Sequence, residues 1–215
     1  FVSAMRVLVT AGPTREAIDP VRFLGNRSSG LMGAELTRAL LVAGHDVVLV
    51  HGPLSVELPQ SDGASLITVA VESALEMLAS CQQHWPSCDA LFAVAAVADY
   101  RPAQVAAQKL KRSADHEMTL QLVPNPDIVA TLAQEKGHRL VLGFALETTD
   151  AETRLAEARR KKAAKNLDWV VANGAEAQGA TESEVSLIGP DDSVTTLGPL
   201  TKNTLAREIV SLIFA

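Results

Sequence analysis

The stretch Arg6-Val-Leu-Val-Thr-Ala-Gly12 and the later Asn26-Arg-Ser-Ser-Gly30 decide the fold of this chain. The first stretch is typical of a short buried strand that ends in a glycine turn. After the second stretch, apolar residues recur at helical spacing from Leu31 to Ala43, and the pattern stops at Gly44. This order of strand, loop and helix is typical of phosphate-binding folds, because the first turn of a helix offers unpaired N–H groups and the positive end of its dipole. We therefore expect an anion site in this loop.

The serine and glycine residues of the loop suit such a site. Ser28 and Ser29 provide hydroxyl donors, and we expect the helix to begin near Ser29. Gly30 and Gly33 allow a ligand or a neighbouring strand to come close. The alternative is that one of the serines only caps the helix.

Apolar runs typical of buried parallel strands recur at Val7–Thr10, Val47–Val50, Leu66–Val69, Leu91–Ala95, Leu140–Phe144 and Trp169–Ala172. Helical patterns lie between most of them, at residues 31–43, 74–81 and 128–133. This alternation predicts an α/β protein with a three-layer Rossmann-like fold and a mostly parallel sheet. Ligands bind at the carboxyl edge of such sheets, so the residues that follow the strands should converge on one crevice: Gly12, Ala96–Asp99, Phe144 and Asn173.

Two segments break the alternation and predict antiparallel ribbon extensions. Met118–Val123 alternates apolar and polar residues, as do Val185–Ile188 and Val194–Leu197, which Gly189-Pro-Asp-Asp192 joins. We expect ribbons over 105–123 and 184–197 to build a homodimer, because half-exposed apolar faces need cover. The alternative is a simple edge extension of the sheet.

Composition limits the class of protein. The 215 residues carry a net charge of −6 and only 4% aromatic residues, which argues against a nucleic-acid partner. Because the chain has neither a long uncharged apolar run nor a signal pattern, we expect no membrane span and a cytoplasmic location. The length suits one domain over residues 5–215, with residues 1–4 as a remnant ahead of a native start at Met5.

Cysteines and histidines give no sign of a metal centre, so metal ligands stay unknown from the sequence. Cys81 and Cys88 are the two cysteines, and we interpret them as reduced packing residues. The five histidines are scattered and form no set with metal-ligand spacing.

Charged residues near the expected crevice suit a nucleotide. Asp99 ends an alanine-rich strand, where its carboxylate could accept a ribose hydroxyl or approach a metal-bound triphosphate. Lys109-Leu-Lys-Arg112 is a basic cluster in the loop that leads to the first ribbon, and cations there would neutralise charge on phosphorus. The alternative is a solvated face.

Seven ordered motifs, which cover nearly the whole chain, resemble the phosphopantothenate-cysteine ligase family of coenzyme A biosynthesis. They are Ala11-Gly-Pro-Thr-Arg-Glu16, Asp19-Pro-Val-Arg22-Phe23, Asn26-Arg-Ser-Ser-Gly30, Ala95-Ala-Val-Ala-Asp-Tyr100, Lys109-Leu-Lys-Arg112, Asn125-Pro-Asp-Ile128 and Gly143-Phe-Ala-Leu-Glu-Thr148. The resemblance implies a homodimer in which 4'-phosphopantothenate attacks the α-phosphate of a nucleoside triphosphate and releases pyrophosphate. The amino group of L-cysteine then captures the acyl-nucleotide.

The resemblance also implies roles for individual residues. Asn26 and Lys109 would be catalytic: Asn26 would hold the acyl-nucleotide, and Lys109 would be needed for turnover. The other nucleotide-binding residues would be Gly12, Ser28, Ser29, Gly30, Asp99, Asn125, Pro126, Asp127, Ile128, Phe144, Lys161 and Lys165, with Mg²⁺ as cofactor and CTP, rather than ATP, as co-substrate. Arg112 stands where the family usually has lysine, and Gly174 stands where it commonly has aspartate, so a carboxylate role at 174 is in doubt.

Many bacterial members of this family are fused to a flavin-dependent phosphopantothenoylcysteine decarboxylase, and no segment here corresponds to it. Either the decarboxylase is a separate partner or it is a fused one, and Met5 favours the separate form.

Two other functions compete with the ligase. An NAD(P)-dependent oxidoreductase of the short-chain type is suggested by the first strand, but no G-x-G-x-x-G begins at Gly12, and Tyr100 has Gln104 instead of lysine four residues later. A non-catalytic nucleotide-binding module would leave Asn26 and Lys109 without a role.

Overall fold

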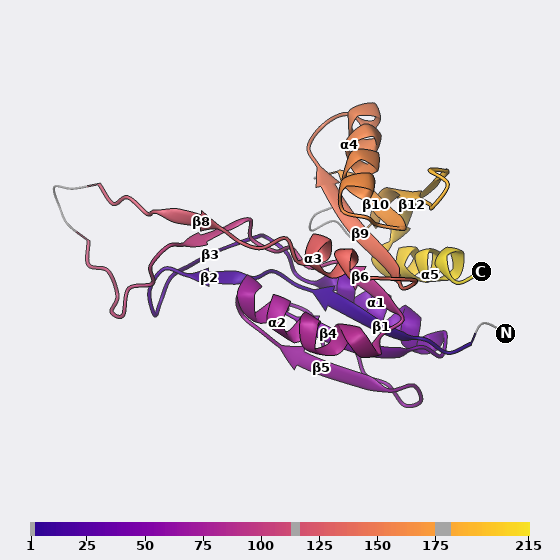
Figure 1. Ribbon diagram of the computed structural model, residues 1–215, viewed down its shortest axis with the longest axis horizontal. Coiled ribbons are helices and arrows are strands. Elements are labelled where there is room, and N and C mark those ends of the chain that lie inside the picture. Colours follow the sequence, from indigo (N-terminus) through magenta and orange to yellow (C-terminus); the bar gives the residue numbers. More distant parts are fainter. Residues whose placement is uncertain (1–2, 113–116, 175–181) are drawn as a thin grey trace.

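The computed structural model describes residues 3–112, 117–174 and 182–215 and contains an eight-stranded sheet (Figure 1). From one edge to the other the strands are β12 (Val194–Thr201), β11 (Glu182–Ile188), β10 (Trp169–Gly174), β9 (Leu140–Glu147), β6 (Ala90–Ala93), β1 (Arg6–Ala11), β4 (Asp46–His51) and β5 (Leu66–Ala70). The last six pair in parallel, so all six predicted strands are confirmed. If these six parallel strands are renumbered 1 to 6 along the chain, their order across the sheet from the β5 edge is 3-2-1-4-5-6, as in a dinucleotide-binding fold. The direction in which successive strands are added reverses between β1 and β6.

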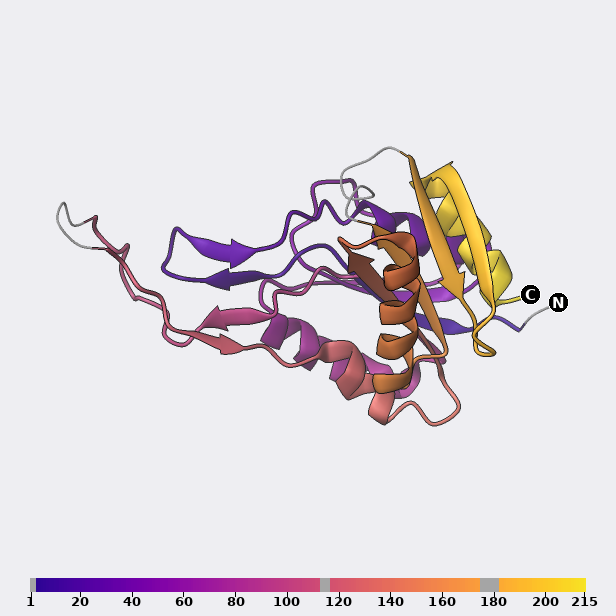
Figure 2. The same cartoon turned by 90° about the horizontal axis from the view of Figure 1, so that it is seen from above.

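Helices cover both faces of the sheet, which confirms the three-layer Rossmann-like architecture (Figures 1 and 2). One face carries α1 (Leu31–Val42) and α5 (Lys202–Ile213), and the other carries α2 (Ala74–His84), α3 (Ile128–Gln134) and α4 (Ala151–Ala164), with the short 3-10 turn η1 (Trp85–Ser87) after α2. In β1, Val9 packs with the core under α1 and α5, whereas its neighbour Leu8 packs with the core under α2 and α3. Burial on both sides explains why the strands read as continuous apolar runs. Cys81 and Cys88 are both buried and unbridged in the second core, as expected, and burial raises the pKa of the Cys81 thiol to about 12.

The second antiparallel ribbon extends the edge of the main sheet. β11 and β12 pair with each other, and β11 pairs with β10. Because Leu187 and Ile188 of β11 are buried and α5 packs against the ribbon, this segment matches the alternative of an edge extension.

A long projection, here called the arm, extends from the carboxyl edge of the sheet (Figures 1 and 2). It consists of two hairpin-like pairs, β2 (Arg15–Ala17) with β3 (Phe23–Gly25) and β7 (Tyr100–Pro102) with β8 (Leu122–Pro124). β2 lies against β7. The expectation of a strand over Met118–Val123 was too long, because pairing begins only at Leu122.

Helix α1 begins at Leu31, two residues later than the expected start near Ser29. Its N-cap is Gly30, which has a left-handed φ of 81° and no side-chain capping bond. A Cβ at Gly33 would lie 2.5 Å from the Cβ of Ala11, so this glycine allows α1 to pack directly on β1. Gly33 was expected to allow the close approach of a ligand or of a neighbouring strand, and in the structure it allows the approach of strand β1.

No helix within the described part of the chain is both long and apolar enough to cross a bilayer.

Candidate functional site

Two loops are locked together where the strand order reverses. The hydroxyl of Thr10 accepts hydrogen bonds from the N–H groups of Val94 and Ala95, and the hydroxyl of Thr14 accepts one from Ala98. The backbone continues the tie, because the Ala96 N–H donates to the Gly12 carbonyl at 2.9 Å. Residues 94–98 therefore form a fixed rim for the crevice, although β6 ends at Ala93 rather than Ala95.

The larger cavity lies beside this rim and has a volume of about 380 Å³. Eight of the predicted nucleotide-binding residues line it together: Asp99, Asn125, Pro126, Asp127, Ile128, Phe144, Lys161 and Lys165. They come from four separate segments of the chain, so their meeting is a property of the fold.

Ion pairs hold three of the charged residues in the wall of the larger cavity: Asp127, Lys161 and Lys165. Lys165 Nζ lies 2.8 Å from Asp127 Oδ2, and Lys161 Nζ donates to Glu147 Oε1. Asp127 also accepts from the Ala130 N–H at 3.0 Å and so begins α3. These pairs offset charge in the wall, which suits a polar uncharged group such as a nucleoside better than a bare polyphosphate.

The Asn125 side chain ties its turn to the rim. Its Nδ2 donates to the Ala98 carbonyl at 2.8 Å, and its Oδ1 accepts from Arg101 at 3.1 Å. The Asn125 N–H in turn donates to the Asp99 carbonyl at 2.8 Å. Asn125 therefore both lines the cavity and positions the turn that carries Pro126, Asp127 and Ile128.

A second cavity of about 300 Å³ lies on the other side of Phe144 and Ala95, which line both cavities. It contains Ser28, Ser29 and Gly30 at the start of α1, the anion site expected from the sequence. The Ser28 and Ser29 hydroxyl oxygens accept from the N–H groups of Gly30 and Leu31 at 3.3 Å, so each hydroxyl keeps its own proton to donate.

The second cavity also contains two further polar residues: Asn173, which was expected in the crevice because it follows a strand, and Lys202, which was not expected there. Asn173 Oδ1 is buried and makes no hydrogen bond to any described residue, so a ligand that donates an N–H or O–H would satisfy it. Lys202 Nζ donates to Ser183 Oγ at 2.7 Å, and burial lowers the pKa of this lysine. The prediction that Asn173 lies in the crevice is thus confirmed, whereas nothing in the local pattern around Lys202 indicates a site.

Asn26 lies outside both cavities and lines a smaller one of about 160 Å³ with Ser28, Arg15 and Phe23. Its Nδ2 donates to the carbonyls of both Ala96 and Val97 at 3.1 Å. Since both amide hydrogens are occupied, the atom that Asn26 presents to a ligand is Oδ1, an acceptor. Asn26 thus offers a ligand an uncharged amide oxygen, while its N–H groups bind the carbonyls of the rim.

Two predicted residues lie apart from the cavities. Gly12 is absent from the lining of all three cavities and instead packs against Gly30, whose Cβ would lie 3.2 Å from the Gly12 Cα. Lys109 is exposed on the arm and lines none of the three.

The described residues contain no cluster of three or more His, Cys, Asp or Glu side chains that could hold a metal ion.

Comparison with known proteins shows the family and the fold of this chain. The model of the DNA/pantothenate metabolism flavoprotein C-terminal domain matches residues 2–215. The coenzyme A biosynthesis bifunctional protein CoaBC of Vibrio cholerae serotype O1 is 48% identical over 176 residues, which are 81% of this chain and 42% of that protein. The chain thus spans about half the length, or less, of the curated relatives it matches.

Solved structures show the same fold. The C-terminal domain of a coenzyme A biosynthesis bifunctional protein CoaBC has a TM-score of 0.80 and 38% identity, with 97% of this chain and 93% of that chain covered. A Cab2 variant in complex with phosphopantothenate-cysteine has a TM-score of 0.80 at 17% identity, with 97% and 86% covered, and shows the fold alone. The chain belongs to the family of the DNA/pantothenate metabolism flavoprotein C-terminal domain.

Proposed function

We propose that this chain is a phosphopantothenate-cysteine ligase of coenzyme A biosynthesis. Family membership supports the pathway, because the relatives are named coenzyme A biosynthesis bifunctional proteins and a solved relative is the C-terminal domain of one. The observation that carries the proposal is the meeting, in one cavity, of eight residues that the family resemblance assigns to the nucleotide; this cavity shares Phe144 with the second cavity, where an anion site is expected at the start of α1.

The two cavities suggest how the substrates are divided. We assign the nucleoside to the larger cavity, where Lys161 and Lys165 are paired with carboxylates, and the phosphates to Ser28, Ser29 and Gly30. The carboxylate of 4'-phosphopantothenate attacks the α-phosphorus, an acyl-phosphate bond forms, and pyrophosphate leaves. The cysteine amine then attacks the acyl carbon, an amide bond forms, and the nucleoside monophosphate leaves. The fixed rim and helix start would hold these groups in line for reaction.

Asn26 is assigned to the acyl part of the intermediate. Because its Nδ2 holds the rim, we propose that Oδ1 accepts a hydrogen bond from an N–H or hydroxyl of the bound substrate. An aspartate at this position would set a carboxylate against the carbonyls of Ala96 and Val97, so it would disturb the rim as well as the intermediate.

Lys109 is assigned to the phosphates, and its place on the arm is the reason for proposing a homodimer. The arm projects away from the main sheet (Figure 2) and exposes several large apolar side chains: Val21, Phe23, Tyr100, Val105, Met118 and Leu122. A second copy would cover these side chains and receive Lys109 at its own site.

The remaining partners extend the same proposal. We propose CTP rather than ATP as co-substrate, as the family resemblance implies, and Mg²⁺ as an ion that enters with the triphosphate, where it would reduce repulsion between the anionic reactants. Cab2, which has the same fold, is known with phosphopantothenate-cysteine, and we extend that product to this chain. We also propose a cytoplasmic location and a phosphopantothenoylcysteine decarboxylase, fused or separate, as the enzyme that acts next.

The test is an assay with 4'-phosphopantothenate, L-cysteine, Mg²⁺ and either CTP or ATP. We expect pyrophosphate release that requires both organic substrates, and an amide product of the expected mass. Nucleotide binding with no product would favour a non-catalytic module. The oxidoreductase alternative is not favoured by the comparisons, and NADH absorbance in the same assay checks it.

A further inference from the structure

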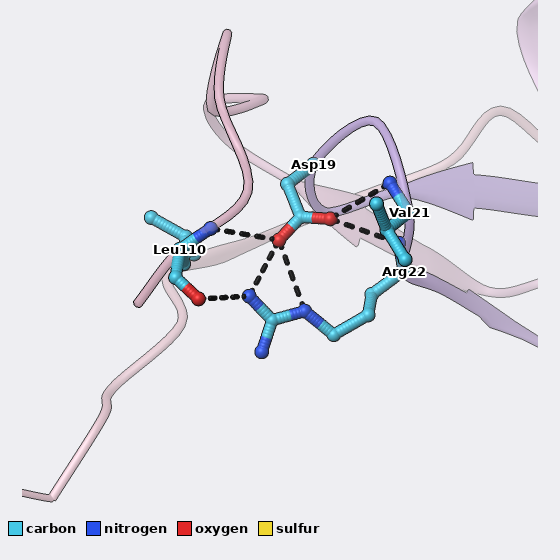
Figure 3. A network of polar contacts seen from close by, with 4 residues as sticks. All are labelled: Asp19, Val21, Arg22 and Leu110. Atoms are coloured by element: carbon cyan, nitrogen blue, oxygen red, sulfur yellow. Dashed lines mark hydrogen bonds and ion pairs between the residues drawn. The ribbon is translucent and has the colours of Figure 1, made fainter. Parts of the chain in front are cut away.

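Asp19 is a buried carboxylate in the arm that joins two segments far apart in the sequence. Its side chain is fully inaccessible and accepts hydrogen bonds from the N–H groups of Val21 and Arg22 at 2.9 Å and of Leu110 at 3.1 Å. The Arg22 guanidinium binds the same carboxylate and also donates to the Leu110 carbonyl at 2.8 Å (Figure 3). One carboxylate thus ties the turn before β3 to the loop after β7.

Several polar groups stabilise the charged form of the Asp19 carboxylate in the arm. Hydrogen bonds to the Arg22 side chain, followed by those from the backbone N–H groups, hold the pKa of Asp19 well below its usual range, against the opposing effect of burial. A buried charge is stable only when it is paired and hydrogen-bonded, and this carboxylate has both kinds of partner. A second bond joins the same two segments, from the Ala106 N–H to the Ile18 carbonyl at 2.9 Å.

The tie fixes the backbone beside Lys109. The Leu110 N–H belongs to the peptide unit that joins Lys109 to Leu110, and the Leu110 carbonyl belongs to the unit that joins Leu110 to Lys111. Both peptide units are held by the pair of Asp19 and Arg22. The two exposed lysines therefore leave the arm from a fixed backbone instead of a freely moving loop.

We propose that Asp19 is a positioning residue that acts through Lys109: it holds the loop so that the ammonium meets the substrate phosphates in a set orientation. This rests on the proposed ligase function. The motif around Asp19 takes part in the family resemblance, but neither the resemblance nor the three cavities assigns this carboxylate to the site. An electrostatic donor that is out of place by about 1 Å can lose about a hundredfold in rate.

The test compares Asp19→Asn with Asp191→Asn, the same change at a carboxylate that binds Ser193 in the turn between β11 and β12. We expect Asp19→Asn to lower kcat about tenfold to a hundredfold, with a smaller change in KM for cysteine, and Asp191→Asn to leave both unchanged. Wild-type kcat in Asp19→Asn would overturn the proposal.

A double variant separates positioning from general damage. In a Lys109→Gln background, Asp19→Asn should have little further effect on kcat, because the group that it positions is gone. If the fold losses in kcat of the two single variants multiply in the double variant, Asp19 acts independently of Lys109, and the proposal is overturned. Leu110→Pro removes the N–H donor while leaving Asp19 and Arg22 in place, and it replaces Asp19→Asn if that variant does not fold.

Hydrogen exchange gives a readout that needs no ligase activity. The Leu110 amide should be protected in the wild type and exchange at least tenfold faster in Asp19→Asn, with unchanged exchange in the main sheet. Equal protection in the two proteins would overturn the inference. If the wild type makes no product while the Leu110 amide behaves as expected, the proposed function fails and the tie between Asp19 and Leu110 stands, so the two failures are distinguishable.

Discussion

The Lys165 ammonium lies 2.8 Å from the Asp127 carboxylate, and both residues line the larger cavity. Asp127 has a second function, because it accepts the Ala130 N–H and caps α3. One side chain thus fixes a helix start and holds a cation at the cavity wall.

The two functions of Asp127 can be separated by substitution. Asp127→Asn keeps an N-cap oxygen and removes the charge, so its free energy of unfolding should fall by less than about 1 kcal/mol, as for a partly exposed ion pair. Asp127→Ala also removes the cap and should cost about 1–2 kcal/mol. Urea denaturation measures both, and equal losses would contradict the capping role.

Gly30 should resist replacement more strongly than another glycine of similar φ. An alanine Cβ at Gly30 would lie 2.2 Å from Leu54 Cδ2, whereas a Cβ at Gly44 would meet nothing within 4 Å, although φ is +81° and +87° respectively. Gly44→Ala should therefore cost about 1 kcal/mol for its backbone alone, and Gly30→Ala about 2–4 kcal/mol because strain and overpacking add. Thermal or urea unfolding of the pair checks this. Similar losses in the free energy of unfolding for the two variants would mean that the Leu54 side chain moves aside at little cost.

The stability of the protein should depend on Asp19 in acid. Because the pKa of Asp19 is lowered from 3.8 in the folded state, the charged carboxylate stabilises the fold fully above that value and less as the pH falls below it. The free energy of unfolding of the wild type should drop between about pH 4 and pH 2, and Asp19→Asn should show a shallower drop. Parallel pH profiles would show that the Asp19 pKa is not lowered.

Asn173 should contribute to ligand binding more than to stability. Its buried Oδ1 has no partner among the described residues, so Asn173→Ala loses no hydrogen bond from that atom and should change the free energy of unfolding by less than about 1 kcal/mol. Affinity for the ligand of the second cavity should fall about fivefold or more. Calorimetric titration with nucleotide and with phosphopantothenate identifies which ligand is affected. Unchanged affinity for both would remove Asn173 from the site.

The sheet was predictable because its strands are buried on both faces and read as apolar runs, as Val47–Val50 does. The helices α4 and α5 were not foreseen. In α4 only Ala158 and Lys162 are buried, since the helix packs mainly through small side chains, and the apolar periodicity is weak. Lys162 pairs with Asp192 at 2.7 Å, a tertiary contact across 30 positions that no local pattern reports.

The site was predictable where residues follow strands or match the family motifs, as Phe144 and Asp127 do. In the arm, the alternation of Met118–Val123 indicated a strand where β8 lies. The pair of β2 and β3 was not predictable, because contacts such as Arg15 stacked on Phe23, with 4.6 Å from the guanidinium to the ring centroid, leave no alternation in the sequence. The engaged donors of Asn26 were also hidden, since they depend on the rim 70 residues away.

The most direct test of the ligase is a single-turnover reaction of the protein with 4'-phosphopantothenate and Mg-CTP in the absence of cysteine, followed by mass spectrometry. We expect one pyrophosphate and one phosphopantothenoyl-nucleotide per active site, and conversion of that species to the amide and nucleoside monophosphate when cysteine is added. Lys109→Gln should form it at least about a hundredfold more slowly than the wild type. Release of inorganic phosphate and nucleoside diphosphate, or no acyl-nucleotide with either CTP or ATP, would contradict the account.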